Sequence, residues 1–222
     1  MDFRNFKNIS EAADFIAQPI ISALKKGKRV LWLVPGGSAI SVAVLAAQKI
    51  ALYPHHRLAV TLTDERYVAV GHADSNWRQL LAAGFSLPQA ESFPVLSGAS
   101  QSDTVRSFSK FLAQELERSD HIAGLFGLGA DGHTAGILPS SPAVSSPDPA
   151  CFYEAGPFQR ITITPRVIGR LSEAVVYAVG REKWPALMQL KENLEINKQP
   201  AQALKQAGQS TIFSDYQYEN NN

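Results

Sequence analysis

The stretch GLGADGHTAGILP, residues 127–139, directly follows the apolar run at residues 122–126. An apolar run that breaks into glycines is typical of a buried strand that ends in a tight turn. Gly127, Gly129 and Gly132 allow backbone angles and close approaches that a side chain would prevent. The sequence therefore predicts a core strand whose carboxyl end opens into a closely packed loop.

Two polar side chains lie inside this loop, two residues apart: Asp131 and His133. An imidazole can take a proton from water at neutral pH. Asp131 could orient the His133 ring or hydrogen-bond a ligand, and the sequence leaves both roles open. A carboxylate and an imidazole beside a glycine-rich strand end predict a general base next to a site for a small anionic ligand.

Apolar runs alternate with segments of helical periodicity, which is the pattern of parallel βαβ units. We expect a single domain over residues 1–222, with an open, mostly parallel Rossmann-like α/β sheet flanked by helices. The expected strands cover residues 29–34, 58–62, 122–127, 161–164, 175–179 and 211–213, and the expected helices cover 11–25, 39–51, 75–83, 102–119 and 182–190.

Local signals add three expectations about the ends of these elements. Ser10 has the side chain of a helix cap and is expected to begin the first helix. Residues 140–157 are expected to form a loop, because four prolines interrupt any helix there. Residues 219–222 are expected to fray.

The composition narrows the ligand classes. With 21 Lys and Arg against 20 Asp and Glu, the chain has no strong field for nucleic acid or an anionic membrane, so anion recognition must be local. Cys151 is the single cysteine, which excludes an internal disulfide and a cysteine-based zinc site, and the histidine spacing suggests no metal. The first residues lack a signal-peptide pattern and no apolar run approaches membrane-spanning length, so a cytoplasmic location is expected.

A second glycine turn, Gly36-Gly37-Ser38, lies between the strand at 29–34 and the helix expected from residue 39. Such a turn presents free N–H groups to an anion, and Ser38 could cap the helix or donate to a phosphate oxygen. The third glycine and the acidic partner of the dinucleotide fingerprint are missing, and there is no P-loop, so the turn predicts neither NAD nor ATP.

A charged cluster, Asp64-Glu65-Arg66, follows the strand at 58–62. Arg66 offers a planar fork suited to phosphate. Asp64 or Glu65 could pair with it, or could hydrogen-bond sugar hydroxyls or loop amides. Because the carboxyl ends of strands in open α/β sheets form the ligand crevice, these distant clusters predict one active site.

These motifs together resemble the 6-phosphogluconolactonases. GLGADGHTAGILP, VPGGSAI at 34–40, TDERYV at 63–68 followed by Ser75-Asn76, and RITIT at 160–164 occur in the order of that family, and the resemblance runs from residue 30 to about residue 190. The chain departs from the family at Ala39-Ile40, where Thr-Pro is usual, and at Gly136-Ile137-Leu138, where Ser-Leu-Phe is usual. Both departures flank the polar residues and bear on loop packing.

The resemblance implies hydrolysis of 6-phospho-D-glucono-1,5-lactone to 6-phospho-D-gluconate in the oxidative pentose phosphate pathway, by a monomer or small homo-oligomer without metal or cofactor. It implies that His133, with Asp131, activates water. It implies a binding site for the sugar phosphate made by Gly36, Gly37, Ser38, Asp64, Glu65, Arg66, Asn76, Gly129, Arg160 and Lys183. Arg181 lies close enough to Lys183 in sequence to replace it.

Two other functions fit parts of the pattern. Glucosamine-6-phosphate deaminases, which the family resembles, read Asp-Glu-Tyr and Asp-Gly-His-Ile in the matching places. This chain has Arg66 for the Tyr, Thr134 for the Ile, and no acidic residue between 132 and 147 to complete a proton relay. A non-catalytic sugar-phosphate sensor could lose the base, whereas this chain has both Asp131 and His133.

Overall fold

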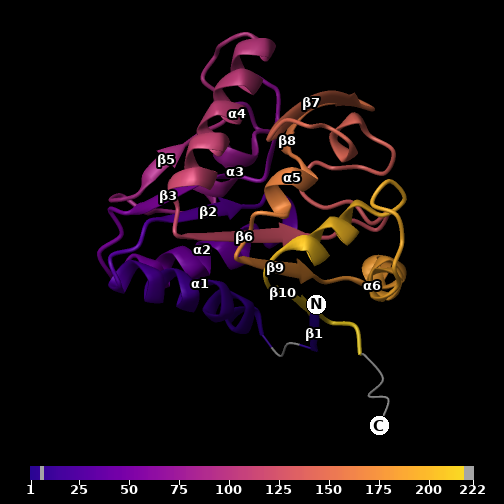
Figure 1. The fold of residues 1–222 in the computed structure, drawn as a ribbon, viewed down its shortest axis with the longest axis horizontal. Helices are drawn as coiled ribbons and strands as arrows, with labels where there is room; N and C mark the ends of the chain where they lie inside the picture. Colours follow the sequence, from indigo (N-terminus) through magenta and orange to yellow (C-terminus); the bar gives the residue numbers. More distant parts are fainter. Residues whose placement is uncertain (6–7, 218–222) are drawn as a thin grey trace.

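A computed structural model describes residues 1–5 and 8–217, which contain two β-sheets (Figure 1). The larger sheet has seven parallel strands in the order β1-β10-β9-β6-β2-β3-β5. These strands are β1 (Asp2–Asn5), β2 (Val30–Val34), β3 (Leu58–Leu62), β5 (Glu91–Phe93), β6 (His121–Gly127), β9 (Glu173–Ala178) and β10 (Ser210–Ser214). The predicted open, mostly parallel α/β sheet is confirmed. The prediction for residues 219–222 lies outside the described residues.

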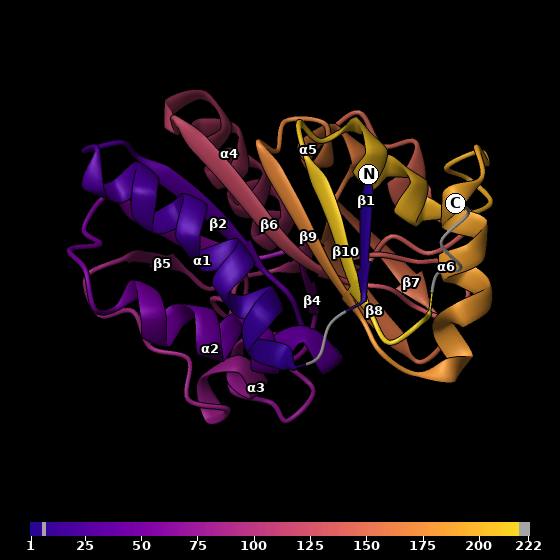
Figure 2. The same cartoon turned by 90° about the horizontal axis from the view of Figure 1, so that it is seen from below.

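Helices cover both faces of this sheet. α1 (Ile9–Lys25) and α2 (Ile40–Ile50) pack on one face, and α4 (Gln101–Arg118) and α5 (Pro165–Ile168) lie on the other (Figures 1 and 2). Every residue of β2 and β3 is buried as a result, which explains why these strands read as continuous apolar runs. Within the described residues, no helix is long and apolar enough to cross a membrane.

The remaining helical segments are short. They are α3 (Asn76–Ala82), α6 (Trp184–Lys191) and the 3₁₀ turns Gly37–Ala39, Pro142–Val144, Arg181–Lys183 and Pro200–Gln206. Strands β6 and β9 run toward the side of the molecule where α6 lies (Figure 1). The loops that follow the core strands therefore meet near this side.

The smaller sheet consists of β4 (Asp64–Arg66), β8 (Phe158–Ile163) and β7 (Ala150–Ala155), and its strands are antiparallel. The prediction that residues 140–157 are all loop is wrong, because β7 occupies their second half. Pro149 and Pro157 flank β7 instead of interrupting it, so Ala150–Ala155 is free to pair with β8. Asp64–Arg66 is likewise a separate strand and not an extension of β3.

The start of α1 also differs from the prediction. The helix begins at Ile9, so Ser10 lies within its first turn and is not the cap. Asn8 is the capping position, although its side chain makes no capping hydrogen bond within the described residues. The edge strands β1 and β5 have no counterpart in the prediction, because they are short and largely exposed and so lack a continuous apolar run.

Candidate active site

A cavity of about 330 Å³ opens beyond the carboxyl ends of β2, β3 and β6. The residues that line it come from five distant parts of the chain: Pro35, Gly36, Gly37, Ser38, Thr63, Asp64, Arg66, Asn76, Gly127, Leu128, Gly129, His133, Ala135, Arg160 and Lys183. Of the residues predicted for the site, Asp131 and Glu65 lie outside this lining. The fold therefore brings together the glycine turn, the charged cluster and the His133 loop, as the strand-end argument predicts.

The loop after β6 folds back on itself to place His133. The Gly129 N–H donates to the His133 carbonyl at 2.9 Å, and Gly132 has φ +81°, which favours glycine. A Cβ on Gly129 would overlap the ring nitrogen Nδ1 of His133, so glycine is required for the ring to lie where it does. The Thr134 hydroxyl donates to the Gly127 carbonyl at 3.0 Å and fixes the far side of the turn.

Asp131 contacts the His133 ring directly. Its Oδ1 lies 2.5 Å from His133 Nδ1 and also accepts the His133 backbone N–H at 3.1 Å. Burial raises the pKa of Asp131. The hydrogen bonds and the electrostatic interaction with His133 outweigh this effect, so the pKa of Asp131 is lowered overall. An ionised carboxylate can only accept, so Nδ1 is the donor, and in the neutral form of the ring the lone pair is then on Nε2. Of the two roles that the sequence left open for Asp131, the geometry supports orientation of the ring.

The smaller sheet holds the next part of the His133 loop. Tyr153 on β7 donates its hydroxyl to the Gly136 carbonyl at 2.6 Å, and Thr162 on β8 accepts the Gly136 N–H at 3.0 Å. A Cβ on Gly136 would lie 2.9 Å from the Thr162 Cβ and 3.0 Å from the Asp64 Cβ. Glycine therefore fits this position where the family usually has serine, and the departure leaves the polar residues in place.

Glu65 lies behind the cavity lining and does not reach it. Its carboxylate is fully buried and accepts the Ser75 hydroxyl at 2.8 Å, and the backbone N–H groups of Asn76 at 2.7 Å and Trp77 at 3.0 Å. Burial raises the pKa of Glu65, and these hydrogen bonds oppose the rise. The sequence left several roles open for Glu65. In the structure it accepts hydrogen bonds from backbone amides and so anchors the start of α3.

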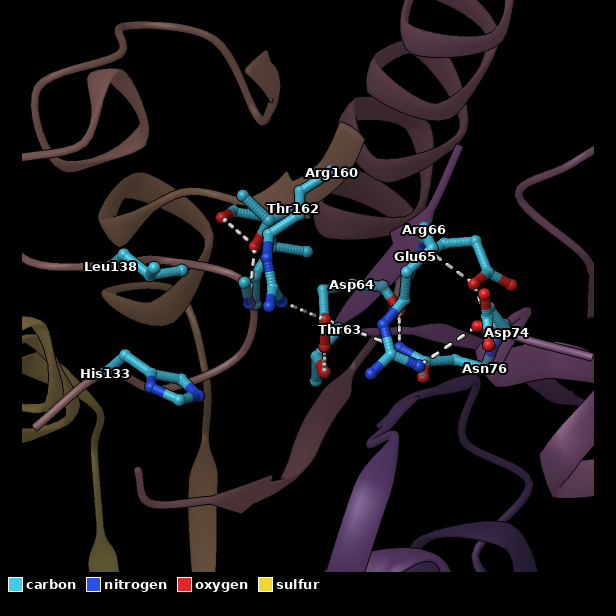
Figure 3. Close-up of polar contacts among 12 residues, drawn as sticks. Thr63, Asp64, Glu65, Arg66, Asp74, Asn76, His133, Leu138, Arg160 and Thr162 are labelled. Atoms are coloured by element: carbon cyan, nitrogen blue, oxygen red, sulfur yellow. Dashed lines mark hydrogen bonds and ion pairs between the residues drawn. The ribbon is translucent and has the colours of Figure 1, made fainter. Parts of the chain in front are cut away.

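Asn76, once anchored, connects the charged cluster. Its Nδ2 donates to the Asp64 carbonyl at 2.8 Å and its Oδ1 accepts from Arg66 Nη1 at 2.5 Å. A Cβ on Gly36 would overlap the Asn76 amide, which explains the glycine there. Arg160 lies in the middle of β8, not at a strand end, and its Nη1 is 3.9 Å from Asp64 Oδ2. In Figure 3, Asp64 and Arg160 lie in the middle, with Arg66 and Asn76 on one side of them and His133 on the other.

The glycine turn after β2 carries the remaining part of the lining. Gly37 has φ +64° and begins the 3₁₀ turn that leads into α2. The first N–H groups of a helix have no partner inside it, so this turn can donate to an anion. Lys183 extends its Nζ to 3.3 Å from Ser38 Oγ, whereas the Arg181 guanidinium lies over the Trp184 ring. Lys183, and not Arg181, is therefore the cation of this segment that lines the cavity.

A cavity lined by three cationic side chains, a glycine turn and an imidazole can bind a small anion and transfer a proton beside it. Within residues 1–5 and 8–217, no three His, Cys, Asp or Glu side chains converge on a metal position. The fold and the site together define an α/β protein whose strand-end cavity combines cationic side chains, a glycine turn and an imidazole.

Comparison with known proteins defines the family. Residues 5–213 match the family described as glucosamine-6-phosphate isomerases/6-phosphogluconolactonase, and the chain belongs to this family. A 6-phosphogluconolactonase of Nostoc sp. is 28% identical over 198 residues, covering 82% of this chain and 80% of the relative. One from Helicobacter pylori is 26% identical over 201 residues, 86% of each chain.

Solved structures share the fold. The 6-phosphogluconolactonase from Thermotoga maritima has a TM-score of 0.79 at 20% identity, covering 96% of this chain and 98% of that one. A monomeric glucosamine-6-phosphate deaminase has a TM-score of 0.76 at 16% identity. Both likenesses concern the fold alone, and the fold accommodates both activities.

Proposed function

We propose that this chain is a 6-phosphogluconolactonase that hydrolyses 6-phospho-D-glucono-1,5-lactone to 6-phospho-D-gluconate in the oxidative pentose phosphate pathway, with His133 as general base. The observation that carries the proposal is the Asp131–His133 pair, whose ring lines the same cavity as Arg66, Arg160 and Lys183. The names of the relatives from Nostoc and Helicobacter support the substrate.

The three cationic side chains of the cavity, Arg66, Arg160 and Lys183, would bind the phosphate. A phosphate dianion needs several positive donors, and these residues supply two guanidinium groups and one ammonium group. The N–H groups of the turn at Gly37 and Ser38 add donors that carry no formal charge. Holding the phosphate here would convert binding energy into the orientation of the lactone ring toward His133.

The His133 side would carry the chemistry. The lactone is an ester whose carbonyl carbon, C1, water can attack, and one proton of that water would pass to His133 Nε2. The bond between C1 and the ring oxygen O5 would then break, and O5 would take this proton from His133 to become the C5 hydroxyl of the open-chain acid. Asp131 would stabilise the imidazolium that forms while keeping the ring in the required tautomer. The Gly129 N–H already donates to the His133 carbonyl. The role of Gly129 would therefore be to place the base and not to stabilise the oxyanion.

The deaminase alternative is less well supported by the residues around the base. A deaminase moves a proton between carbon atoms and needs a relay of ionisable groups. Where that pattern has Tyr, this chain has Arg66, which lines the cavity. The residue after His133 is Thr134, whose hydroxyl donates to the Gly127 carbonyl. The sensor alternative does not account for the contact between the Asp131 carboxylate and the His133 ring.

The deciding experiment measures 6-phosphogluconate formation from freshly prepared lactone against a control without protein, with glucosamine-6-phosphate as a second substrate. We expect hydrolysis of the lactone well above the spontaneous rate and no release of ammonia. Ammonia release without lactone hydrolysis would support the deaminase, and binding without either reaction would support the sensor. The cytoplasmic location stays a prediction, and so does the assembly as a monomer or a small homo-oligomer.

A further inference from the structure

The ring of Phe158, the first residue of β8, lies close to both arginines of the cavity. The guanidinium carbons of Arg66 and of Arg160 are each 5.8 Å from the ring centroid. Cations within about 6 Å of a ring centroid are attracted by the electron-rich face. One aromatic side chain thus lies within this range of two guanidinium groups that come from different strands.

These two arginines form an unfavourable pair in the absence of an anion. Arg66 and Arg160 face each other directly across the β4–β8 ladder, and like charges opposite each other destabilise a sheet. Arg66 Nη1 donates only to neutral oxygens, of Asp74 and Asn76, and Arg160 has a distant carboxylate at 3.9 Å. The Nε atoms of both arginines are buried and have no hydrogen-bond partner among the described residues. If the two guanidinium groups are to bind an anion, the group that orients them should not accept hydrogen bonds from their N–H groups.

Phe158 is placed to give this support from outside the ligand cavity. It lines a neighbouring hollow of about 380 Å³, together with Arg66, and is not among the residues that line the cavity with His133. An aromatic ring attracts a cation through its face without accepting its hydrogen bonds as a carboxylate would. A carboxylate at this position would neutralise the arginines and occupy their donors.

We propose that Phe158 is a positioning residue that holds the guanidinium groups of Arg66 and Arg160 toward the cavity, and that it thereby sets the preference for phosphorylated over unphosphorylated lactones. The inference rests on the proposed function, because it assigns the arginine pair to the phosphate of the substrate. Phe158 itself does not touch the ligand and acts through the two arginines.

The test compares two substitutions at this position with one matched control. Phe158→Leu removes the aromatic face and keeps an apolar side chain, and Phe158→Tyr keeps the ring. Phe152→Leu is the control, because Phe152 lies on β7 of the same sheet and no guanidinium group of the described residues lies over its ring. The Phe152 ring packs edge-on against Tyr67, with 6.1 Å between the ring centroids. Circular dichroism melts establish that each variant is folded.

The first measurement is calorimetric titration with 6-phosphogluconate, and the second is kcat/KM on the phosphorylated and the unphosphorylated gluconolactone. We expect Phe158→Leu to weaken 6-phosphogluconate binding about 5- to 20-fold. It should lower kcat/KM on the phosphorylated lactone by a similar factor and leave the unphosphorylated substrate unchanged. Phe158→Tyr should remain within about twofold of wild type, as should Phe152→Leu.

Equal binding by Phe158→Leu and wild type would overturn the inference, and so would an equal loss on both lactones, which would indicate a structural role. A wild type that does not bind 6-phosphogluconate would overturn the proposed function as well. Wild-type binding with no effect at Phe158 would overturn only the inference. If Phe158→Leu does not fold, Phe158→Met offers an adaptable apolar side chain for the same comparison.

Discussion

Replacing Asp131 by Asn tests how the base is oriented. The Asp131 carboxylate accepts His133 Nδ1 at 2.5 Å, and an amide at the same position can turn its NH₂ toward the ring. The ring would then accept at Nδ1 and carry its proton on Nε2, where the base is needed. A charge-assisted hydrogen bond contributes about 1.5–3 kcal/mol, which corresponds to a factor of about 10–100. The side chain of Asp131 is 49% exposed, so solvent screening favours the lower part of this range.

The assay is steady-state lactone hydrolysis, corrected for the spontaneous rate, with Asp131→Asn, His133→Ala and the double variant. His133→Ala should lower kcat by about 10²–10⁴ while the affinity for 6-phosphogluconate stays nearly unchanged, because a base acts only in the chemical step. Asp131→Asn should lower kcat about 10-fold or more with little change in KM, and should add nothing in the His133→Ala background. A rise in KM, or a further loss in the double variant, would refute the orienting role and indicate that Asp131 contacts the substrate.

Three further predictions concern other parts of the chain. Arg66→Ala should raise KM for the phosphorylated lactone about 10- to 100-fold, since it removes a charge-assisted contact, and an equal effect on unphosphorylated lactone would contradict the phosphate role. Burial raises the pKa of Glu173 from 4.5 to about 7, so the folded state binds more protons than the unfolded state between these values, and the free energy of unfolding should fall as pH rises through this window. Urea unfolding at pH 5 and pH 8 should show that loss, on the order of 2–3 kcal/mol, in wild type but not in Glu173→Gln; a parallel loss in both would exclude Glu173 as the cause. Exhaustive chelation and Cys151→Ser should leave activity intact, and activity restored only by a divalent metal would replace His133 as base by a metal-bound hydroxide.

The central part of the fold could be predicted because its signals are local. Strands β2, β3 and β6 are buried on both faces, so each appears as a continuous apolar run, and each run ends in a glycine or charged motif. The edge strands β1 and β5 could not be predicted, because their short exposed segments carry no such run. The prediction for the start of α1 is wrong because Ser10, which lies next to the true first residue Ile9, has the side chain of a helix cap.

The direction of the Glu65 side chain follows from the alternation of residues along a strand. Alternate residues of a strand point to opposite faces, so within Asp64-Glu65-Arg66 the outer two share a face and Glu65 points away. The structure has this arrangement, with Asp64 and Arg66 at the cavity and Glu65 bound to the start of α3. Because the cluster is itself a strand, its alternation distinguishes Asp64, which lines the cavity, from the buried Glu65.

Local patterns predict only part of β8 in the smaller sheet and not its pairing, although this sheet connects both halves of the proposed mechanism. Its pairing joins Arg66 to Arg160 across more than ninety residues of chain, which places the two guanidinium groups side by side. The same sheet binds Gly136 through Tyr153 and Thr162, and so fixes the loop that carries His133. Because one sheet holds both the arginine pair and the base loop, a change in its pairing should alter phosphate binding and turnover together. Substitutions at Arg66 and at Asp131 should instead separate the two.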